Sequence, residues 1–179
     1  MDLEEVIIKR GNKMNVIEYV KQKHSGQKRK QGTPYYLHPV AVSKILKDKG
    51  FGTEYQIAGL FHDLLEDTDT SYEEIKEISN RHIADAVLLV TKEPGYTKEN
   101  YYKRIKENDM ARMVKLADRM HNLSEAHFAD RAFQKKYIKE TEKWFIDLAK
   151  GTVFEEDINR ELEALKETYN KSFPEGIEY

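Results

Sequence analysis

Apolar residues recur at intervals of three and four along most of the chain, which is the spacing of one face of an α-helix. Three of the clearest runs are Val16 with Val20, then Ile57, Leu60, Phe61 and Leu64, then Ile83, Val87 and Val90. Sustained strand-like alternation of apolar and polar residues is absent. The pattern therefore predicts an all-α chain of about eight or nine helices.

Glycine, proline and small polar residues separate the helical stretches. The breaks fall at Gly26 to Pro34, Gly50 to Thr53, Asp67 to Ser71, Pro94-Gly95, and near Gly151. Ser71 and Glu74 have the spacing of a capping box, which predicts that a helix starts just after Ser71. A long late helix is expected over 133–148. We expect one compact helical bundle over 1–179, with a motif-bearing core over about 5–150 and a helical extension over about 151–179.

Composition narrows the chemistry. The 179 residues include no cysteine, which excludes disulfides, thiolate zinc sites and a cysteine nucleophile. The net charge of −2 does not point to a nucleic-acid polymer as partner. No apolar run approaches the roughly 20 residues of a membrane helix. Residues 1–5 lack the basic and apolar segments of a secretory signal, so the expected location is cytoplasmic.

Two imidazoles and two carboxylates stand out as candidate metal ligands: His38, His62, Asp63 and Asp118. Each of them alone is more often a structural or surface residue. The stretch 56–67, however, places acids among apolar neighbours, and an ionised carboxylate is costly to bury without a partner. A cation is the simplest partner, so the joint pattern predicts a metal site.

Glu66 and Asp67 follow His62-Asp63 by one helical turn. Residues four apart lie on the same face of a helix, so these acids are expected to face the metal ligands. The alternative is an exposed helix end leading into a polar turn over 68–70. Beside His62-Asp63 the catalytic interpretation is favoured, in which the two acids orient a water or carry its proton.

Nitrogen and oxygen ligands without sulfur favour Mn²⁺, while Fe²⁺, Co²⁺, Mg²⁺ and Zn²⁺ also fit. A divalent ion in such a site can polarise a phosphoryl oxygen and acidify a water, which indicates hydrolysis. His24, His82 and His127 have no acidic motif around them and are interpreted as structural. His121 is interpreted in the same way, because it lies about 300° round the helix from Asp118.

Four ordered blocks carry a family resemblance. They are Gly26-Gln27-Lys28-Arg29-Lys30, Gly32-Thr33-Pro34-Tyr35 with His38-Pro39, Leu60 to Thr68, and Val114 to Asn122. Over about 5–150 the chain resembles the HD-domain metal-dependent phosphohydrolases, and within them the hydrolase domain of RelA/SpoT-type alarmone enzymes and their small single-domain relatives. The resemblance implies a guanosine 3′,5′-polyphosphate (ppGpp) 3′-pyrophosphohydrolase that releases pyrophosphate. No synthetase or regulatory domain is expected to follow.

The substrate contacts rest on charge and on this resemblance. Arg29 can stack on a purine, and Lys30 can meet a phosphate as a mobile charge. Asn122, one turn after Asp118, is expected to face the same pocket, and the resemblance carries nucleotide binding onto these residues. Lys115 is a further phosphate candidate that could equally be a surface lysine.

Two alternatives to alarmone hydrolysis stay open at this point. Ser124 and Glu125 depart from the arginine and threonine usual in alarmone hydrolases, which leaves room for a general HD nucleotidase or phosphatase. A non-catalytic nucleotide sensor is the other alternative, but a sensor has no need to keep all six metal and acid groups. The strongly charged final helix, near 157–169, either caps the bundle or contributes to a homodimer.

Overall fold

The computed structural model describes residues 6–9 and 12–172, with side chains from 14 to 171. The predictions for the first five residues and for the tail after Ser172 lie outside this part. The chain forms two compact units, Met1–Ala117 and Asp118–Tyr179. Helix α8 (Asp109–Ala126) runs from the first unit into the second. The single-domain organisation with an extension near residue 151 stays a prediction.

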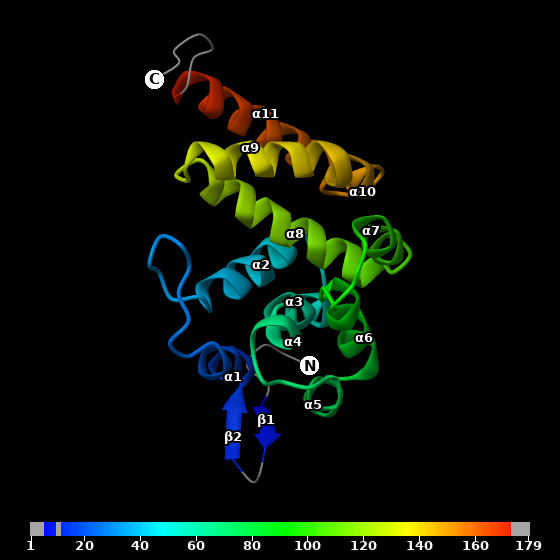
Figure 1. Cartoon of the computed structure of the whole chain (residues 1–179). Helices are drawn as coiled ribbons and strands as arrows, with labels where there is room; N and C mark the ends of the chain where they lie inside the picture. The colour runs from blue at the N-terminus through cyan, green and yellow to red at the C-terminus, as the bar shows by residue number, and fades with distance from the viewer. Residues whose placement is uncertain (1–5, 10–11, 173–179) are drawn as a thin grey trace. The chain divides into compact units, whose positions relative to one another are not determined.

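The first unit is built around α3. Its elements are β1 (Val6–Lys9), β2 (Asn12–Asn15), α1 (Val16–Lys23), α2 (Leu37–Asp48), α3 (Thr53–Phe61), α4 (Leu64–Asp67), α5 (Tyr72–Ile78), α6 (Arg81–Val90), α7 (Lys98–Lys106) and the start of α8. Helix α3 packs against α1, α2 and α6 (Figure 1). Its residues 56–61 are all buried. The segment that ends in the His62-Asp63 motif is therefore the core of this unit.

Local sequence signals start several of these helices. The Ser71 hydroxyl accepts a hydrogen bond from the Glu74 N–H at 3.1 Å, so the predicted cap of α5 is confirmed. Asn80 caps α6 in the same way, by accepting from the Ile83 N–H at 3.0 Å. Such caps satisfy backbone donors that the first helical turn leaves without partners.

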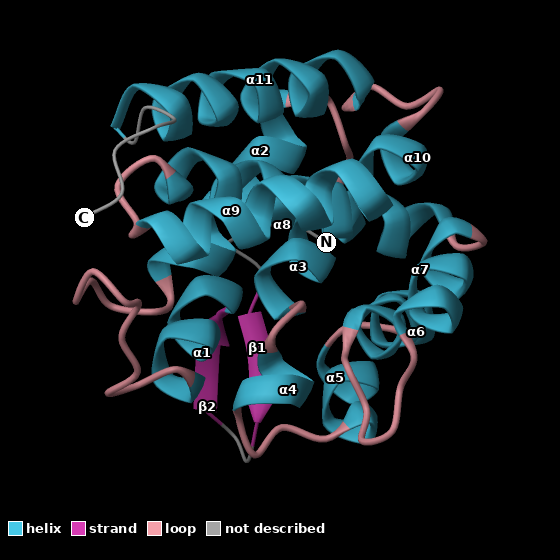
Figure 2. Ribbon diagram, turned by 45° about the horizontal axis from the view of Figure 1, so that its top comes forward, coloured by secondary structure: helices cyan, strands magenta, loops and turns pink. Residues whose placement is uncertain are grey.

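The chain also forms a short antiparallel hairpin of β1 and β2, in which Val6 pairs with Asn15 and Lys9 with Asn12 (Figure 2). This hairpin was not predicted. Each strand has four residues, which is too short for an alternating pattern to stand out. The predicted all-α class is nevertheless confirmed, because the remaining described elements are helical.

Helices α2 and α3 approach closely at Gly59. A Cβ added at Gly59 would lie 2.8 Å from Leu46 Cδ1 and 3.4 Å from the Ser43 backbone. Real Cβ contacts are essentially never as short as the first distance, so only glycine fits between these helices without a shift. This close approach matters because α2 carries His38 and α3 leads directly into His62.

The second unit contains the rest of α8 and the helices α9 (Arg131–Glu140), η1 (Thr141–Phe145), α10 (Ile146–Ala149) and α11 (Glu155–Ser172). Helix α9 packs against α11, and Phe145 and Phe154 are fully buried. The predicted late helix is thus present, but with a π-helical segment in its middle. If α3 with α4, and α9 with η1 and α10, each count as one interrupted helix, the described residues form nine helices, as predicted.

Candidate functional site

The His62-Asp63 motif lies at a break between two helices. Helix α3 ends at Phe61 and α4 begins at Leu64, so both residues form the turn between them. The sequence pattern predicted one continuous helix here, in which each acid follows a ligand by one turn. One helical hydrogen bond nevertheless spans the break. The Asp67 N–H donates to the Asp63 carbonyl oxygen at 3.0 Å, so this part of the predicted geometry is present.

The ring of His62 is oriented by the helix that precedes it. Its Nδ1 lies 2.6 Å from the Gly59 carbonyl oxygen. A carbonyl can only accept, so Nδ1 carries the proton, and in the neutral ring Nε2 presents a lone pair. The side chain is almost completely buried. His62 thus has the tautomer and orientation of a metal-binding histidine.

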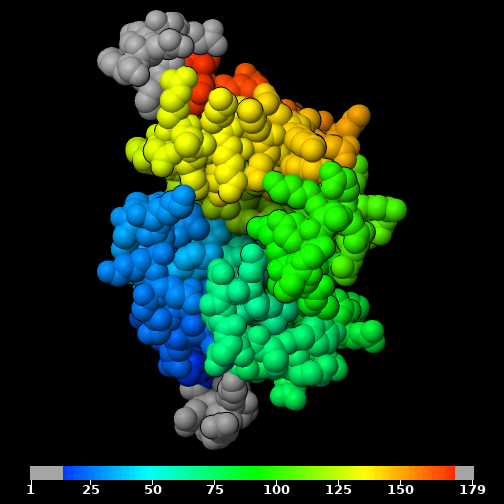
Figure 3. All heavy atoms as spheres, in the orientation of Figure 1, coloured from blue at the N-terminus to red at the C-terminus, as the bar shows by residue number. Residues whose placement is uncertain are grey.

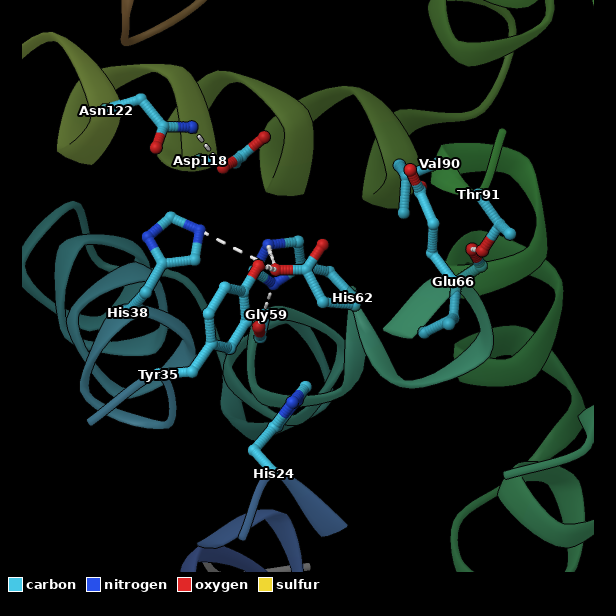
Figure 4. A network of polar contacts seen from close by, with 12 residues as sticks. His24, Tyr35, His38, Gly59, His62, Glu66, Val90, Thr91, Asp118 and Asn122 are labelled. Carbon is cyan, nitrogen blue, oxygen red and sulfur yellow. Dashed lines mark hydrogen bonds and ion pairs between the residues drawn. The ribbon is translucent and has the colours of Figure 1, made fainter. Parts of the chain in front are cut away.

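Asp63 lies beside both histidines. Its Oδ2 is 2.9 Å from His62 Nε2 and 3.7 Å from His38 Nε2. The Tyr35 hydroxyl donates to the same oxygen at 2.8 Å (Figure 4). A neutral His62 would place a lone pair against a carboxylate, which is unfavourable unless a positive charge lies between or beside them. The donor set of this unit therefore suits a cation.

Three of the predicted ligands come together. His38, His62 and Asp118 are buried, and each offers one ligand atom within 4.8 Å of the other two. Two imidazole nitrogens and a carboxylate oxygen are suitable ligands for a divalent metal ion. Asn122 donates from Nδ2 to Asp118 Oδ1 at 2.7 Å, and this bond orients the carboxylate. Ligation by Asp63 stays a prediction.

Asp67 ends α4 at the protein surface. On the face shown in Figure 3, the blue-green surface around α4 lies between the blue surface of the α1–α2 segment and the green surface of α6 and α7. Loss of hydration, followed by the negative charge of Asp63, raises the pKa of the Asp67 carboxyl above its ordinary value. Hydrogen bonding from Tyr35 works in the opposite direction. A carboxyl with a raised pKa is a better proton carrier near neutral pH.

Glu66 contacts a different part of the unit. Its Oε2 accepts a hydrogen bond from the Lys92 backbone N–H at 3.2 Å, and its Oε1 lies 3.8 Å from Lys92 Nζ. Figure 4 shows this carboxylate beside the end of α6, near Val90 and Thr91. The catalytic assignment of Glu66 and Asp67 stays a prediction, and Asp67 has the closer relation to the ligand network.

The predicted substrate residues come from separate places. Arg29 and Lys30 lie in the loop between α1 and α2, and the Arg29 guanidinium is 5.8 Å from the Tyr35 ring centroid. Lys115 Nζ lies 5.9 Å from the Tyr101 ring centroid. The Asn122 side chain donates its hydrogen bond to Asp118, as described above. Nucleotide contacts by these four residues stay predictions.

One neighbour of the site was missed. Tyr35 is expected from the sequence only as part of the block that delivers His38, whereas its hydroxyl bonds Asp63. The interpretation of His24 as structural stays a prediction, and this histidine is buried with its ring centroid 5.0 Å from that of Tyr35. His121, by contrast, lies 3.9 Å from Glu125 and outside the ligand group.

Within the described ranges, 6–9 and 12–172, no helix combines the length and the apolar character needed to cross a membrane. This agrees with the composition, in which charged residues make up 35%.

Comparisons of the sequence and of the structure with known proteins point to the same family. The HD domain matches residues 17–152. A guanosine-3′,5′-bis(diphosphate) 3′-pyrophosphohydrolase of Aquifex aeolicus is 42% identical over 74% of this chain, which spans 20% of that enzyme. The MESH1 enzyme of Danio rerio, of the same descriptive name, is 30% identical over 77% of this chain and 82% of its own length. The structure titled as a metazoan ortholog of SpoT that hydrolyzes ppGpp has a TM-score of 0.69 and 26% identity, covering 85% of this chain and 92% of that one. The chain therefore belongs to the HD domain family and is related to the SpoT/RelA hydrolase domains and the small MESH1-type hydrolases, as the sequence motifs predicted.

Proposed function

We propose that this protein is a metal-dependent phosphohydrolase that removes pyrophosphate from the 3′ position of guanosine 3′,5′-bis(diphosphate). The observation that carries the proposal is the buried group of His38, His62 and Asp118, in which the tautomer of His62 is fixed by Gly59. The relatives from Aquifex aeolicus and Danio rerio are named for that activity.

These three residues, with Asp63 as the fourth predicted ligand, would hold the metal ion, and Mn²⁺ is the favoured ion because the donors are nitrogen and oxygen without sulfur. When bound, the ion supplies Lewis-acid polarisation of a phosphoryl oxygen and acidifies a water. Asn122 keeps the Asp118 carboxylate oriented toward that role. Tyr35 does the same for Asp63.

The remaining steps fall to side chains around the ligand group. The Asp67 carboxylate would accept a proton from the attacking water and return it to the departing pyrophosphate oxygen. Arg29 offers a planar cation to the purine, and Lys30 a flexible cation to a phosphate. The hydrogen bond between Glu66 and the Lys92 N–H holds α4 against the residues that follow α6. It thereby helps to fix the position of Asp67, the next residue of α4.

Glu125 is the strongest argument for a different nucleotide. A carboxylate three residues after Asn122 on α8 would repel a phosphate that came near it. His121 Nε2 lies 3.9 Å from Glu125 Oε1, so this carboxylate has a neighbour on its own helix. The alarmone stays the favoured substrate because relatives such as the Aquifex aeolicus and Danio rerio enzymes are named for it, and another nucleotide phosphoester is the second candidate.

The metal assignment is tested by replacing ligands. His62→Ala and Asp118→Ala should each abolish stoichiometric Mn²⁺ binding, measured by metal content after dialysis and by titration calorimetry. His82→Ala is the matched control, because His82 is an exposed histidine of α6 outside the ligand group. Wild-type metal affinity in both ligand variants would remove the assignment.

The substrate assignment is tested with a nucleotide panel at equal Mn²⁺. Guanosine 3′,5′-bis(diphosphate), GDP, GTP and a simple phosphomonoester are compared by kcat/KM, with pyrophosphate release measured directly. A clear preference for the bis(diphosphate) is expected. Equal or faster cleavage of the other compounds would leave a general HD nucleotidase, and no cleavage of any of them would support the sensor alternative.

A further inference from the structure

His24 is a buried histidine that neither the metal site nor the proposed substrate contacts use. It caps the C-terminus of α1, and its side chain is 1% exposed. Its Nδ1 lies 2.8 Å from Gln27 Oε1. An amide oxygen can only accept, so Nδ1 carries the proton and donates to Gln27.

Gln27 also forms a hydrogen bond to Asp67, the last residue of α4. Its Nε2 donates to the backbone carbonyl of Asp67 at 2.7 Å, which also fixes which end of the amide faces His24. Two hydrogen bonds in series therefore join His24 to the last residue of α4. A helix of four residues has almost no stability of its own, so such contacts decide where it ends and where its last side chain lies.

The same two residues also contact the ligand network. The Gln27 carbonyl accepts from the Tyr35 N–H at 2.9 Å, and the His24 ring packs on the Tyr35 ring at 5.0 Å between centroids. The Tyr35 hydroxyl in turn bonds Asp63. Figure 4 shows the His24 ring directed toward the side of the network where Tyr35 lies. His24 and Gln27 thus hold Asp67 and Tyr35 relative to each other.

Burial of His24 is costly in one respect. Its Nε2 is buried and makes no hydrogen bond within the part of the chain that the structure describes. An unsatisfied buried nitrogen lowers stability, and an apolar residue at this position would avoid that loss. A histidine here is therefore better explained by its Nδ1 donor than by packing alone.

We infer that His24 and Gln27 are positioning residues for Asp67, which hold the end of α4 so that the Asp67 carboxyl stays beside Tyr35 and Asp63. The inference rests on the proposed role of Asp67 in hydrolysis. Neither residue touches the reacting atoms in this scheme, so their loss should lower turnover without altering metal binding or KM.

Gln27→Met removes both hydrogen bonds at similar volume. It should lower kcat by about ten- to a hundredfold, the usual effect of a misplaced catalytic group, while KM and Mn²⁺ content stay within about twofold of wild type. His24→Phe keeps the ring packing but loses the donor. It should show the same loss of kcat, with KM and Mn²⁺ content unchanged. His24→Asn restores a donor near the Nδ1 position, and should recover at least part of the lost turnover.

Lys23→Met is the matched control. Lys23 also ties α1 to the segment after α4, through Asp69 at 2.8 Å and Glu74 at 3.3 Å, but makes neither of the two bonds to Asp67 and Gln27. Its kcat should stay within about threefold of wild type. An equal loss of turnover in Lys23→Met, or no recovery in His24→Asn, would mean that general tethering of the segment matters and would overturn the inference.

A second measurement separates this inference from the proposed substrate. Amide hydrogen exchange over 64–70 is followed in Mn²⁺-loaded protein without nucleotide. Faster exchange at Asp67 and Thr68 in Gln27→Met, but not in Lys23→Met, supports the positioning role whichever nucleotide is cleaved. Unchanged exchange in Gln27→Met would overturn it, even if the bis(diphosphate) is the substrate.

Discussion

Asn122 donates a hydrogen bond from Nδ2 to Oδ1 of Asp118, 2.7 Å away and one turn earlier on α8. The bond occupies one oxygen of a buried carboxylate and so fixes the direction of the other. Asn122 was predicted from the sequence as a nucleotide contact. Its position indicates a second role, in which it holds a metal ligand in place.

Asn122→Ala should therefore weaken metal binding as well as nucleotide binding. Loss of a residue that orients a metal ligand typically lowers metal affinity by about 10- to 100-fold. Competition between the protein and a chelator for Mn²⁺ measures this directly. Ser124→Ala is the control, because the exposed Ser124 hydroxyl donates to the His121 carbonyl on the same helix. Unchanged Mn²⁺ affinity in Asn122→Ala would leave Asn122 as a substrate residue alone.

Gly59→Ala should destabilise the protein through the α2–α3 contact. The added methyl would lie 2.8 Å from Leu46 Cδ1, and overpacking of a tight core typically costs about 1–3 kcal/mol. Chemical denaturation of Gly59→Ala, Leu46→Val and the double variant measures the effect. The double variant should lose less stability than the sum of the two single variants, because Leu46→Val removes the clashing atom. Simple additivity would contradict a steric cause.

The helices were predictable because their signals are local. Apolar spacing, glycine breaks and the Ser71 cap act over a few residues, and the structure follows them. The hairpin over 6–15 was missed because pairing of two four-residue strands leaves almost no pattern in the sequence. The π-helical turn at 141–145 was missed for a similar reason, since its hydrogen-bond register depends on packing rather than on composition.

The candidate site was predictable in its chemistry and less so in its geometry. His38, His62 and Asp118 were recognisable as ligands because imidazoles and carboxylates that approach an apolar core together need a cation as their partner. The helix break at His62-Asp63 was not recognisable, since the flanking residues favour one continuous helix. From the sequence spacing, Glu66 and Asp67 are both expected to face the metal ligands. In the structure Glu66 bonds Lys92, and Asp67 interacts with Asp63 and Tyr35.

Tyr35→Phe should change the pH dependence of turnover. The Tyr35 hydroxyl lies 2.8 Å from Asp63 Oδ2, and a hydrogen bond that its single proton gives to Asp67 instead would lower the pKa of Asp67. Without the hydroxyl, the pKa of Asp67 should rise further, so the limb of the pH–kcat/KM profile that reports Asp67 should move to higher pH. Tyr36→Phe is the adjacent control and should leave the profile in place. Identical profiles for Tyr35→Phe and wild type would exclude this coupling.

Asp67→Asn should make the metal-free protein more stable at neutral pH while reducing its activity. Because the pKa of Asp67 is raised in the folded state, its ionisation opposes folding as the pH rises above the ordinary value of 3.8. Asparagine cannot ionise, so the Tm advantage of the variant should be present at pH 7 and fade as the pH falls to about 3. Asp69→Asn should show the opposite sign at pH 7, since Lys23 lowers the pKa of Asp69. Thermal unfolding in chelator at both pH values measures each change, and equal shifts of the two variants at pH 7 would contradict the assignment.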